Sequence, residues 1–400
     1  MMTPSSAPDS LSPYRDDLSE REKSGQLRRC KLVEPVEAAS NIDVQVDGQA
    51  AVNFSSNDYL GLSRDKRLQE AAIQAIRRYG TGSAASRLIS GTNELVATLE
   101  HQLAEFKQAE AAMVFNSGYQ ANVSILQAIL EPGDWVFCDK LNHASLMDGC
   151  LLSGARWTRY RHLDLENLEA RLKKAPADVK KWVVTDSVFS MDGDYPDLTA
   201  LVDIADQYGA LVMIDEAHAT GLYGDKRSSG LCEQFGLSER IALQMGTFSK
   251  ALGGAGAYVA GSRVLIDTLI NKARGFIYST ALPPAVIGTA LKAIEVVQSD
   301  AEPKRRLWQN VATFERLARE AGLEARLSLP LSSPIIPLLI GDSSETLRIS
   351  QQLLEAGYFA QGIRPPTVPP GTSRLRIALS AAHSELQIEG LVMALARLSG

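Results

Sequence analysis

Residues 247–254 read TFSKALGG and place a lysine, Lys250, in a turn between apolar runs at 241–245 and 255–260. Thr247 and Ser249 supply hydroxyl groups on one side of this lysine, and small residues on the other side let the backbone pass close to a ligand. Such a lysine can form a Schiff base with an aldehyde, and the groups beside it can hold a phosphate. Pyridoxal 5'-phosphate (PLP) needs both features. Taken alone, the stretch is also compatible with a surface lysine on a glycine-rich hairpin.

Short apolar runs alternate with helical patterns on both sides of this stretch. The apolar runs lie at 112–115, 135–138, 182–185, 211–214, 241–245 and 255–260, and the helical patterns at 120–130, 143–152, 165–174, 198–208 and 262–274. Strands that are apolar throughout and are joined by helices predict an α/β fold with a mainly parallel sheet covered on both faces. Ligands of such sheets bind at the carboxyl ends of the strands.

The order of the elements predicts three parts. Residues 1–50 form an N-terminal segment, with a disordered start to about residue 18, a short helix over 18–30 and a hairpin around Asp47-Gly48. Residues 51–285 form the large PLP-binding α/β domain. Residues 286–400 form a smaller C-terminal α+β domain, in which Ser384 and Gln387 make a capping box for the last helix.

Composition excludes several classes of function. The net charge of the 400-residue chain is −6, so no nucleic-acid-binding surface is implied. No apolar stretch approaches the roughly 18 residues needed to span a membrane. The four cysteines lack CxxC spacing and the five histidines lack metal-ligand spacing, so we expect reduced thiols, no metal site and a cytoplasmic protein.

Polar residues follow the predicted strands. Asp215 ends the run 211–214, where burial would disfavour a carboxylate unless a cation lies beside it. A pyridinium N–H would be that cation, and His218 could then hydrogen-bond the phenolic oxygen of the cofactor. A metal pair or a satisfied buried pair is the alternative, but Lys250 after the next strand favours the cofactor.

Other strand ends give weaker signals. Residues 116–120, NSGYQ, open a helix and could seat a phosphate. His143 could present its ring to a flat ligand, or it could only cap its helix. Ser190 could face the same edge of the sheet, or its hydroxyl could only hydrogen-bond its own backbone. Arg374 and Arg376 share one face of a late strand, where an arginine fork can bind a carboxylate or simply meet solvent.

Nine motifs between residues 53 and 383 resemble the α-oxoamine synthases, a family of fold-type I PLP-dependent transferases. They are NFSSNDYLGLS, GTGSAASRLISGT, FNSGYQAN, NHASLMDG, DSVFSMDGD, IDEAHATGLYG, TFSKALGG, IYSTALPP and IRPPTVPPGTSRLRIALSAAH. The IRPPTVP stretch resembles the members that use L-alanine and a pimeloyl thioester more than it resembles their glycine-using relatives. Ala84-Ala85 depart from the glycine that relatives often carry in the small-residue loop.

The resemblance implies roles for particular residues. Lys250 would bind PLP and later move the Cα proton, Asp215 would pair with the pyridine nitrogen, and His143 would stack on the ring. His218 and Ser190 would contact the phenolic oxygen. Gly118, Tyr119 and Thr247 would hold the phosphate, aided by Ser279 and Thr280 of a second subunit. Arg376 would bind the amino-acid carboxylate, Asn57 and Thr367 would lie near the substrates, and Arg28 would bind the acyl-chain carboxylate.

The resemblance also implies a reaction and its partners. A homodimer with shared active sites would condense L-alanine with a pimeloyl thioester, carried on CoA or on an acyl carrier protein, and release CO2 in an early step of biotin synthesis. The alternatives within the family are 2-amino-3-oxobutyrate CoA ligase, 5-aminolevulinate synthase and serine palmitoyltransferase. A PLP aminotransferase and a non-catalytic scaffold with the same fold are the alternatives outside it.

Overall fold

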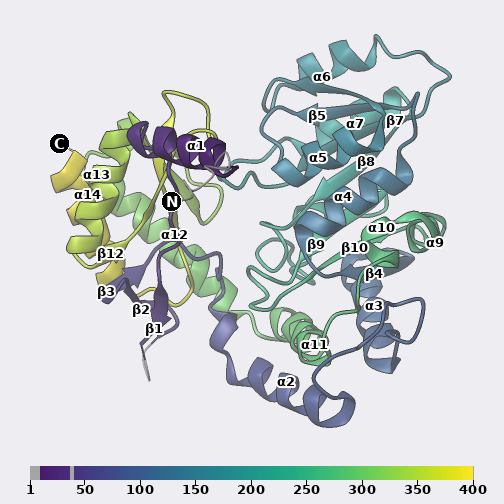
Figure 1. Ribbon diagram of the computed structural model, residues 1–400, viewed down its shortest axis with the longest axis horizontal. Helices are drawn as coiled ribbons and strands as arrows, with labels where there is room; N and C mark the ends of the chain where they lie inside the picture. Colours follow the sequence, from purple (N-terminus) through teal and green to yellow (C-terminus); the bar gives the residue numbers. More distant parts are fainter. Residues whose placement is uncertain (1–9, 37–39, 400) are drawn as a thin grey trace, which may run out of the picture.

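The larger lobe is built on a seven-stranded sheet (Figure 1). The computed structural model describes residues 10–36 and 40–399. In sheet order the strands are β4 (Ala111–Phe115), β10 (Ala257–Gly261), β9 (Leu243–Thr247), β8 (Ala210–Asp215), β7 (Lys181–Asp186), β5 (Trp135–Asp139) and β6 (Arg156–Tyr160). Strand β10 pairs antiparallel with both neighbours, whereas β9, β8, β7, β5 and β6 pair parallel. The predicted α/β fold with a mainly parallel sheet is confirmed.

Helices cover both faces of this sheet. On one face lie α4 (Gly118–Ile129), α5 (Ala144–Ser153), α9 (Arg263–Lys272) and α10 (Arg274–Ile277). On the other lie α2 (Lys66–Tyr79), α3 (Glu94–Lys107), α6 (Leu165–Leu172), α7 (Leu198–Gln207), α8 (Leu231–Gln234) and α11 (Pro284–Ser299). Each face of the sheet packs a hydrophobic core against its helices, and successive residues of a strand point alternately into these two cores, as Met113 and Val114 of β4 do. Polar side chains therefore gather at the strand ends.

The smaller lobe joins the two ends of the chain. Its antiparallel sheet is β11 (Ile335–Gly341), β14 (Ser373–Ala378) and β13 (Gln361–Ile363), with α12 (Glu302–Glu320), α13 (Ser343–Glu355) and α14 (Glu385–Ser399). A second sheet has the order β1 (Val33–Pro35), β2 (Asp43–Val46), β3 (Gln49–Asn53) and β12 (Tyr358–Phe359), and β3 pairs parallel with β12. Short 3-10 turns are η1 (Leu62–Arg64) and η2 (Glu324–Arg326). The domain boundaries remain predictions, and α11 spans the one at 285/286.

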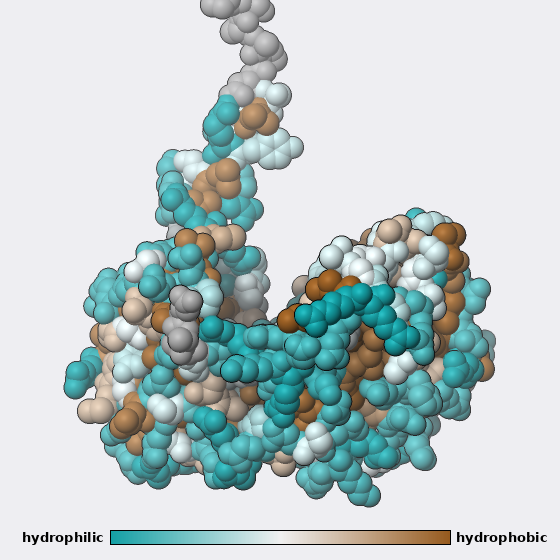
Figure 2. Space-filling view, turned by 90° about the horizontal axis from the view of Figure 1, so that it is seen from below, coloured by the Kyte–Doolittle hydropathy of each residue, from teal (hydrophilic) through white to brown (hydrophobic). Residues whose placement is uncertain are grey.

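The N-terminal helix begins earlier than the sequence predicted. Helix α1 spans Ser12–Lys23, whereas disorder was expected to about residue 18; residues 1–9 of that range lie outside the described residues. Pro13 in the first turn and the Asp17–Arg21 pair at 2.8 Å favour the helix. None of its residues is buried, and Figure 2 shows it standing away from the body of the molecule.

Most predicted elements are present with shifted ends. The Asp47-Gly48 hairpin is β2–β3, and the Gln387 amide donates to Ser384 Oγ at 3.3 Å in the predicted capping box. Strand β6 was missed because RWTRY is mostly polar, as a strand at a sheet edge can be, and lacks the continuous apolar run of the central strands. Within residues 10–36 and 40–399, every helix is too short or too polar to cross a bilayer.

Candidate active site

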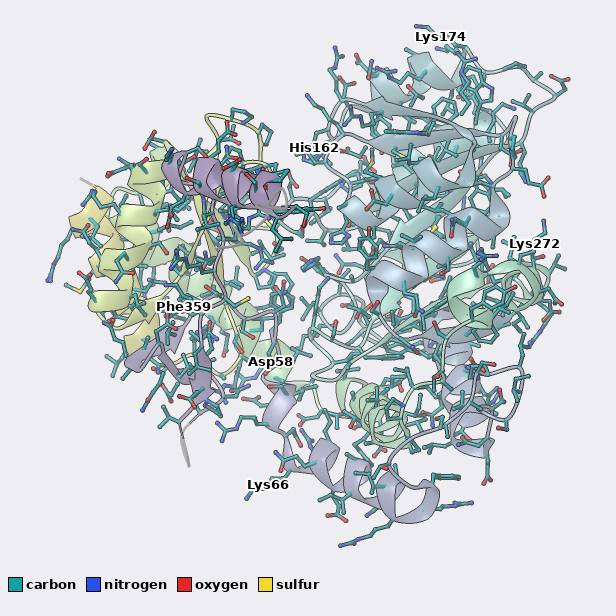
Figure 3. All side chains as sticks on the ribbon, viewed as in Figure 1. Asp58, Lys66, His162, Lys174, Lys272 and Phe359 are labelled. Carbon is teal, nitrogen blue, oxygen red and sulfur yellow. The ribbon has the colours of Figure 1, made fainter. Side chains whose placement is uncertain are left out.

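The carboxyl ends of the parallel strands face the small lobe. His162, two residues beyond β6, marks this edge in Figure 3. A cavity of about 780 Å³ lies here, and Figure 2 shows the molecule hollowed between its lobes. Seven residues singled out from the sequence line it: Asn57, His143, Ser190, His218, Lys250, Thr367 and Arg376. The structure thus brings together side chains from both lobes in one cavity.

Lys250 lies in the turn after β9 and opens onto this cavity. Burial among protein atoms lowers the pKa of its amine to about 8, although Asp215 and Asp186 act in the opposite direction. A substantial share of the amine is therefore neutral near pH 8, and a neutral amine is the nucleophilic form.

Two carboxyl groups lie beneath the cavity on neighbouring strands. Asp186 ends β7 and Asp215 ends β8, and the two are register partners. Asp215 accepts hydrogen bonds from Asn122 Nδ2 at 2.7 Å and from the Ala217 amide at 2.9 Å. Burial and, next, the charge of Asp215 raise the pKa of Asp186 well above its usual range. Burial therefore favours the neutral form of Asp186, while Asp215, held by its two N–H donors, is the carboxyl group placed to face a cationic ring.

The two histidines of the cavity are neutral. His143 caps α5, with its Nδ1 at 2.7 Å from Ser145 Oγ, and burial lowers its pKa. Burial, and then the charges of Lys250 and Arg376, lower the pKa of His218 well below its usual value. Both rings can therefore act as hydrogen-bonding or stacking groups without adding positive charge to a site that already holds Lys250 and Arg376.

The two arginines of β14 have different surroundings. Arg374 pairs with Asp192 of the loop after β7, so its charge is already compensated. Arg376 donates from Nε to Ser190 O at 2.6 Å and from Nη2 to Asn57 Oδ1 at 3.0 Å, and it pairs with no carboxylate in the described part of the chain. Its side chain is buried and lines the cavity. Arg376 is thus the one of the two that is open to an incoming carboxylate.

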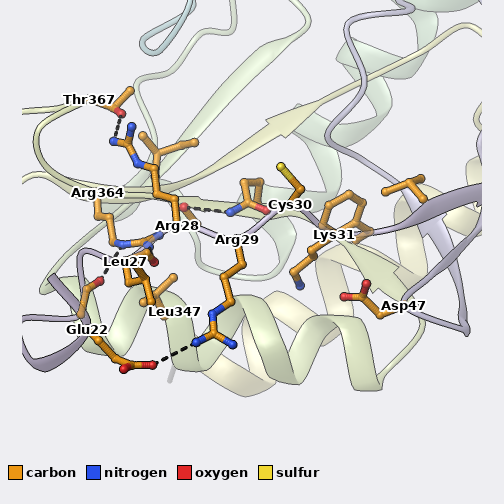
Figure 4. A pocket seen from close by; sticks show the side chains of 16 residues that line it. Glu22, Leu27, Arg28, Arg29, Cys30, Lys31, Asp47, Leu347, Arg364 and Thr367 are labelled. Atoms are coloured by element: carbon orange, nitrogen blue, oxygen red, sulfur yellow. Dashed lines mark hydrogen bonds and ion pairs between the residues drawn. The ribbon is translucent and has the colours of Figure 1, made fainter. Parts of the chain in front are cut away.

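A second cavity of about 860 Å³ adjoins the first (Figure 4). The two share Phe359, Gln361, Ile363 and Thr367 as lining residues. Arg28 donates to Thr367 Oγ1 at 2.9 Å, and Arg364 donates to the carbonyl oxygens of Gly25 and Leu27. This places Arg28 in the second cavity, with Thr367 between it and the Lys250 cavity.

The residues expected to bind the phosphate are not among those that line the cavity. Gly118 and Tyr119 open α4, where the Tyr119 hydroxyl donates to Asp148, and Thr247 Oγ1 bonds Gly256 O at 2.7 Å. Ser279 Oγ accepts from Gln120 Nε2 at 2.6 Å, and Thr280 O accepts from Asn116 at 3.0 Å, both near the start of α4.

Sequence reasoning missed several side chains of this site. Asp186 ends an apolar run just as Asp215 does, so the same signal could have found it. Asn122 lies on the inner face of α4 with its amide on Asp215, and Tyr59 is wholly buried beside His218. No sequence pattern distinguishes these two from ordinary core residues, because their partners are distant in the chain.

Comparison with known proteins places this geometry in a family. Residues 49–395 match the model of the class I and II aminotransferases. The 8-amino-7-oxononanoate synthase of Geobacter sulfurreducens is 50% identical over 357 residues, 89% of this chain and 90% of the relative. The enzyme of the same name from Anaeromyxobacter dehalogenans is 48% identical over 374 residues, 92% of this chain and 91% of the relative.

The chain belongs to the 8-amino-7-oxononanoate synthase family. Solved structures agree on the fold. The serine palmitoyltransferase of Sphingomonas wittichii superposes with a TM-score of 0.92 at 30% identity, covering 98% of both chains. An 8-amino-7-oxononanoate synthase from Francisella tularensis superposes with a TM-score of 0.74 at 30% identity, covering 87% of this chain and 97% of that one. Members of this 8-amino-7-oxononanoate synthase group are PLP-dependent enzymes of the α-oxoamine synthase type, and PLP is the cofactor of the chain.

The residues present fit PLP. Lys250 offers a partly neutral amine at the cavity, and Asp215 offers a carboxylate held by two N–H donors. His143 supplies a neutral ring at the cavity wall, and the start of α4 supplies backbone N–H groups for a phosphate. These are the groups that an aldehyde, a pyridine nitrogen, an aromatic face and a phosphate require.

Proposed function

We propose that the chain is an 8-amino-7-oxononanoate synthase, which condenses L-alanine with a pimeloyl thioester in biotin biosynthesis and releases CO2 and the free thiol. The observation that carries this proposal is the cavity itself: Lys250, with a pKa of about 8, faces the same space as Arg376, a buried cation without a carboxylate partner in the described part of the chain. The identity of 50% to a synthase of that name supports the choice among related reactions.

PLP, when bound, supplies an aldehyde that takes up the amino group of alanine and a ring that accepts the electron pair left at Cα. The role of Lys250 is to hold the cofactor and to accept the proton from Cα. A neutral amine can accept that proton, and the low pKa of Lys250 keeps enough of it neutral near pH 8.

The groups around Lys250 orient the ring. Asp215, held by Asn122 and Ala217, would pair with the pyridine nitrogen and stabilise the proton there. His143 would stack on the ring, and His218 and Ser190 would hydrogen-bond the phenolic oxygen, since all three line the cavity. Gly118, Tyr119 and Thr247 hold the phosphate, a role that the nearby start of α4 supports.

The substrates occupy the two adjoining cavities. Arg376 binds the carboxylate of alanine, since a guanidinium fork matches a carboxylate through two hydrogen bonds. Arg28 binds the far carboxylate of the pimeloyl chain in the second cavity, Thr367 lies where the two cavities meet, and Asn57 lines the Lys250 cavity near the alanine. The thiol carrier is CoA or an acyl carrier protein.

We also propose a cytoplasmic homodimer with shared active sites. Four apolar side chains are more than half exposed near the start of α4: Leu88, Ile89, Tyr119 and Tyr278. These four side chains come from three segments of the chain, which the Ser86–Thr280 β-bridge and the Gln120–Ser279 hydrogen bond hold close together. Clustered exposed apolar residues are typical of interfaces, and Ser279 and Thr280 lie at this cluster, from which they can reach a second subunit.

The proposal is tested by product analysis. PLP-loaded protein is mixed with pimeloyl-CoA and with L-alanine, glycine or L-serine in turn, and the products are identified by mass. We expect 8-amino-7-oxononanoate with alanine and its loss in Lys250→Ala. Product from glycine or serine alone would move the function to the relatives that use those amino acids, and near-normal turnover by Lys250→Ala would overturn the assignment of Lys250.

A further inference from the structure

Tyr59 connects two groups of the site without lining the cavity itself. Its side chain is 0% exposed, and its hydroxyl lies 2.8 Å from His218 Nδ1, 3.1 Å from Asn57 Oδ1 and 3.4 Å from Arg376 Nη2. Its own backbone is held by the Ala381 amide, which donates to Tyr59 O at 2.7 Å. One buried phenol thus touches the histidine on the cofactor side and the arginine on the carboxylate side of the cavity.

The hydrogen bonds decide where the phenol proton lies. The Tyr59 oxygen accepts from Arg376 Nη2, and its hydroxyl has two acceptors within reach, Asn57 Oδ1 at 3.1 Å and His218 Nδ1 at 2.8 Å. Asn57 Oδ1 also accepts from Arg376 Nη2 at 3.0 Å, so it keeps a donor when the phenol proton points to His218. The shortest contact of the hydroxyl is to His218 Nδ1. Burial raises the pKa of Tyr59, so the phenol keeps its proton. The contact with His218 Nδ1 is shorter than the contact with Asn57 Oδ1, and this geometry directs the proton to the histidine nitrogen.

This donation fixes the tautomer of His218. A neutral imidazole whose Nδ1 accepts a hydrogen bond carries its proton on Nε2. Nε2 of His218 has no hydrogen-bond partner among the residues that the structure describes, and the ring lines the cavity. The proton on Nε2 is therefore available to a ligand oxygen in the cavity.

We propose that Tyr59 is a positioning residue that holds His218 in the Nε2–H tautomer and ties it to Arg376. The role of His218 toward the phenolic oxygen of PLP rests on the proposed function, whereas the tautomer does not. Through the shared phenol, the cofactor donor and the carboxylate-binding arginine are kept in one fixed arrangement.

The direct test is nuclear magnetic resonance of protein labelled with 15N-histidine, with and without PLP. His218→Gln assigns the His218 signals. We expect the Nε2–H tautomer in the wild type and a mixture of tautomers in PLP-free Tyr59→Phe, which loses only the hydroxyl. Tyr258→Phe is the matched control, because Tyr258 is also wholly buried and its hydroxyl hydrogen-bonds Thr220, which lies outside the cavity lining. An Nδ1–H tautomer in the wild type, or an unchanged tautomer in Tyr59→Phe, would overturn the proposal.

Binding and kinetics give the second readout. In Tyr59→Phe we expect the Kd for PLP and the KM for L-alanine each to rise about fivefold, as for one lost hydrogen bond, and Tyr258→Phe to leave both unchanged. Equal values in Tyr59→Phe and the wild type would contradict the positioning role. If the wild type makes no product from alanine, the proposed function fails, but the tautomer and the PLP affinity still test Tyr59.

Discussion

At the scale of single residues, the chemistry of the site depends on how burial changes the charge of a few side chains. Burial lowers the pKa of Lys250, so part of its amine is neutral, whereas the buried side chain of Arg376 presents a guanidinium, a group that stays charged in proteins. Burial raises the pKa of Asp186 and favours its neutral form, while Asp215 accepts hydrogen bonds from two N–H donors. The cavity is therefore lined by one partly neutral amine and one guanidinium, and the hydrogen-bonded carboxyl group of Asp215 lies at the end of the neighbouring strand β8.

The lowered pKa of Lys250 predicts how PLP capture depends on pH. The neutral amine attacks the aldehyde, so the rate at which PLP-free protein takes up PLP should rise with pH, reach half its maximum near pH 8 and level off above it. Stopped-flow absorbance of PLP binding measures this rate. A rate that keeps rising to above pH 10, where an ordinary lysine titrates, would contradict the role of burial.

Arg376 and Arg374 form a matched pair for a test of carboxylate binding. Arg376→Lys keeps the charge but loses the guanidinium fork, and we expect the KM for L-alanine to rise about 10- to 100-fold. Arg374→Lys is the control, since Arg374 already pairs with Asp192, and its KM should stay within about twofold of the wild type. Steady-state kinetics decides, and equal effects of the two changes would argue against Arg376 as the carboxylate ligand.

At the scale of elements, His162 holds together the segments that follow three strands. Its Nδ1 lies 2.9 Å from Asp139 at the end of β5, and its Nε2 lies 3.1 Å from Asp194 of the loop after β7. Burial alone would lower the pKa of His162, but these two carboxylates raise it to about 10. The same loops carry His143 and Ser190, so this ion-paired histidine steadies two walls of the cavity.

His162→Gln should therefore destabilise the fold by about 1–3 kcal/mol, because Asp139 would be left buried without its cation. The folded-state pKa is raised, so the stabilisation is complete below about pH 6.5 and is lost as pH rises through about 10. Urea unfolding at several pH values measures the difference between the two proteins. His101→Gln is the control, as His101 is exposed beside Glu105, and a difference that grows with pH would refute the argument.

At the scale of the whole molecule, the two ends of the chain build one lobe, and the site lies where that lobe meets the large sheet. Strand β3 pairs with β12, about three hundred positions later, and Arg28 reaches Thr367. The exposed cluster of Leu88, Ile89, Tyr119 and Tyr278 lies on the large lobe near the start of α4. The structure thus places the substrate cavities between the lobes and an apolar cluster suited to a second copy at the start of α4, next to the residues expected to hold the phosphate.

The homodimer proposal predicts a change in mass. Wild-type protein should sediment at twice the mass of one chain, and Ile89→Asp should shift it toward the single-chain mass, because a charge would be buried in the interface. Analytical ultracentrifugation measures both. Leu386→Asp, at a similarly exposed leucine in α14 of the small lobe, should stay dimeric, and a dimeric Ile89→Asp would show that the interface lies elsewhere.

The sequence by itself determined the sheet and the set of polar residues at its strand ends. Apolar runs fix which segments are buried strands, and a parallel arrangement then brings residues such as His143, Asp215 and Lys250 to one edge. This reasoning is local and needs only the hydrophobic pattern. It fails for β6, whose edge position allows polar residues within the strand.

Only the tertiary structure decided which charges are paired and which are free. Arg374 and Arg376 are alike in the sequence, but Arg374 forms an ion pair with Asp192, whereas Arg376 donates a hydrogen bond to the Ser190 carbonyl oxygen. Tyr59 is an ordinary buried aromatic residue until folding brings it to His218 and Arg376. Such contacts join segments hundreds of residues apart, and hydrogen bonds and ion pairs depend on distances of a few tenths of an ångström, which no sequence pattern contains.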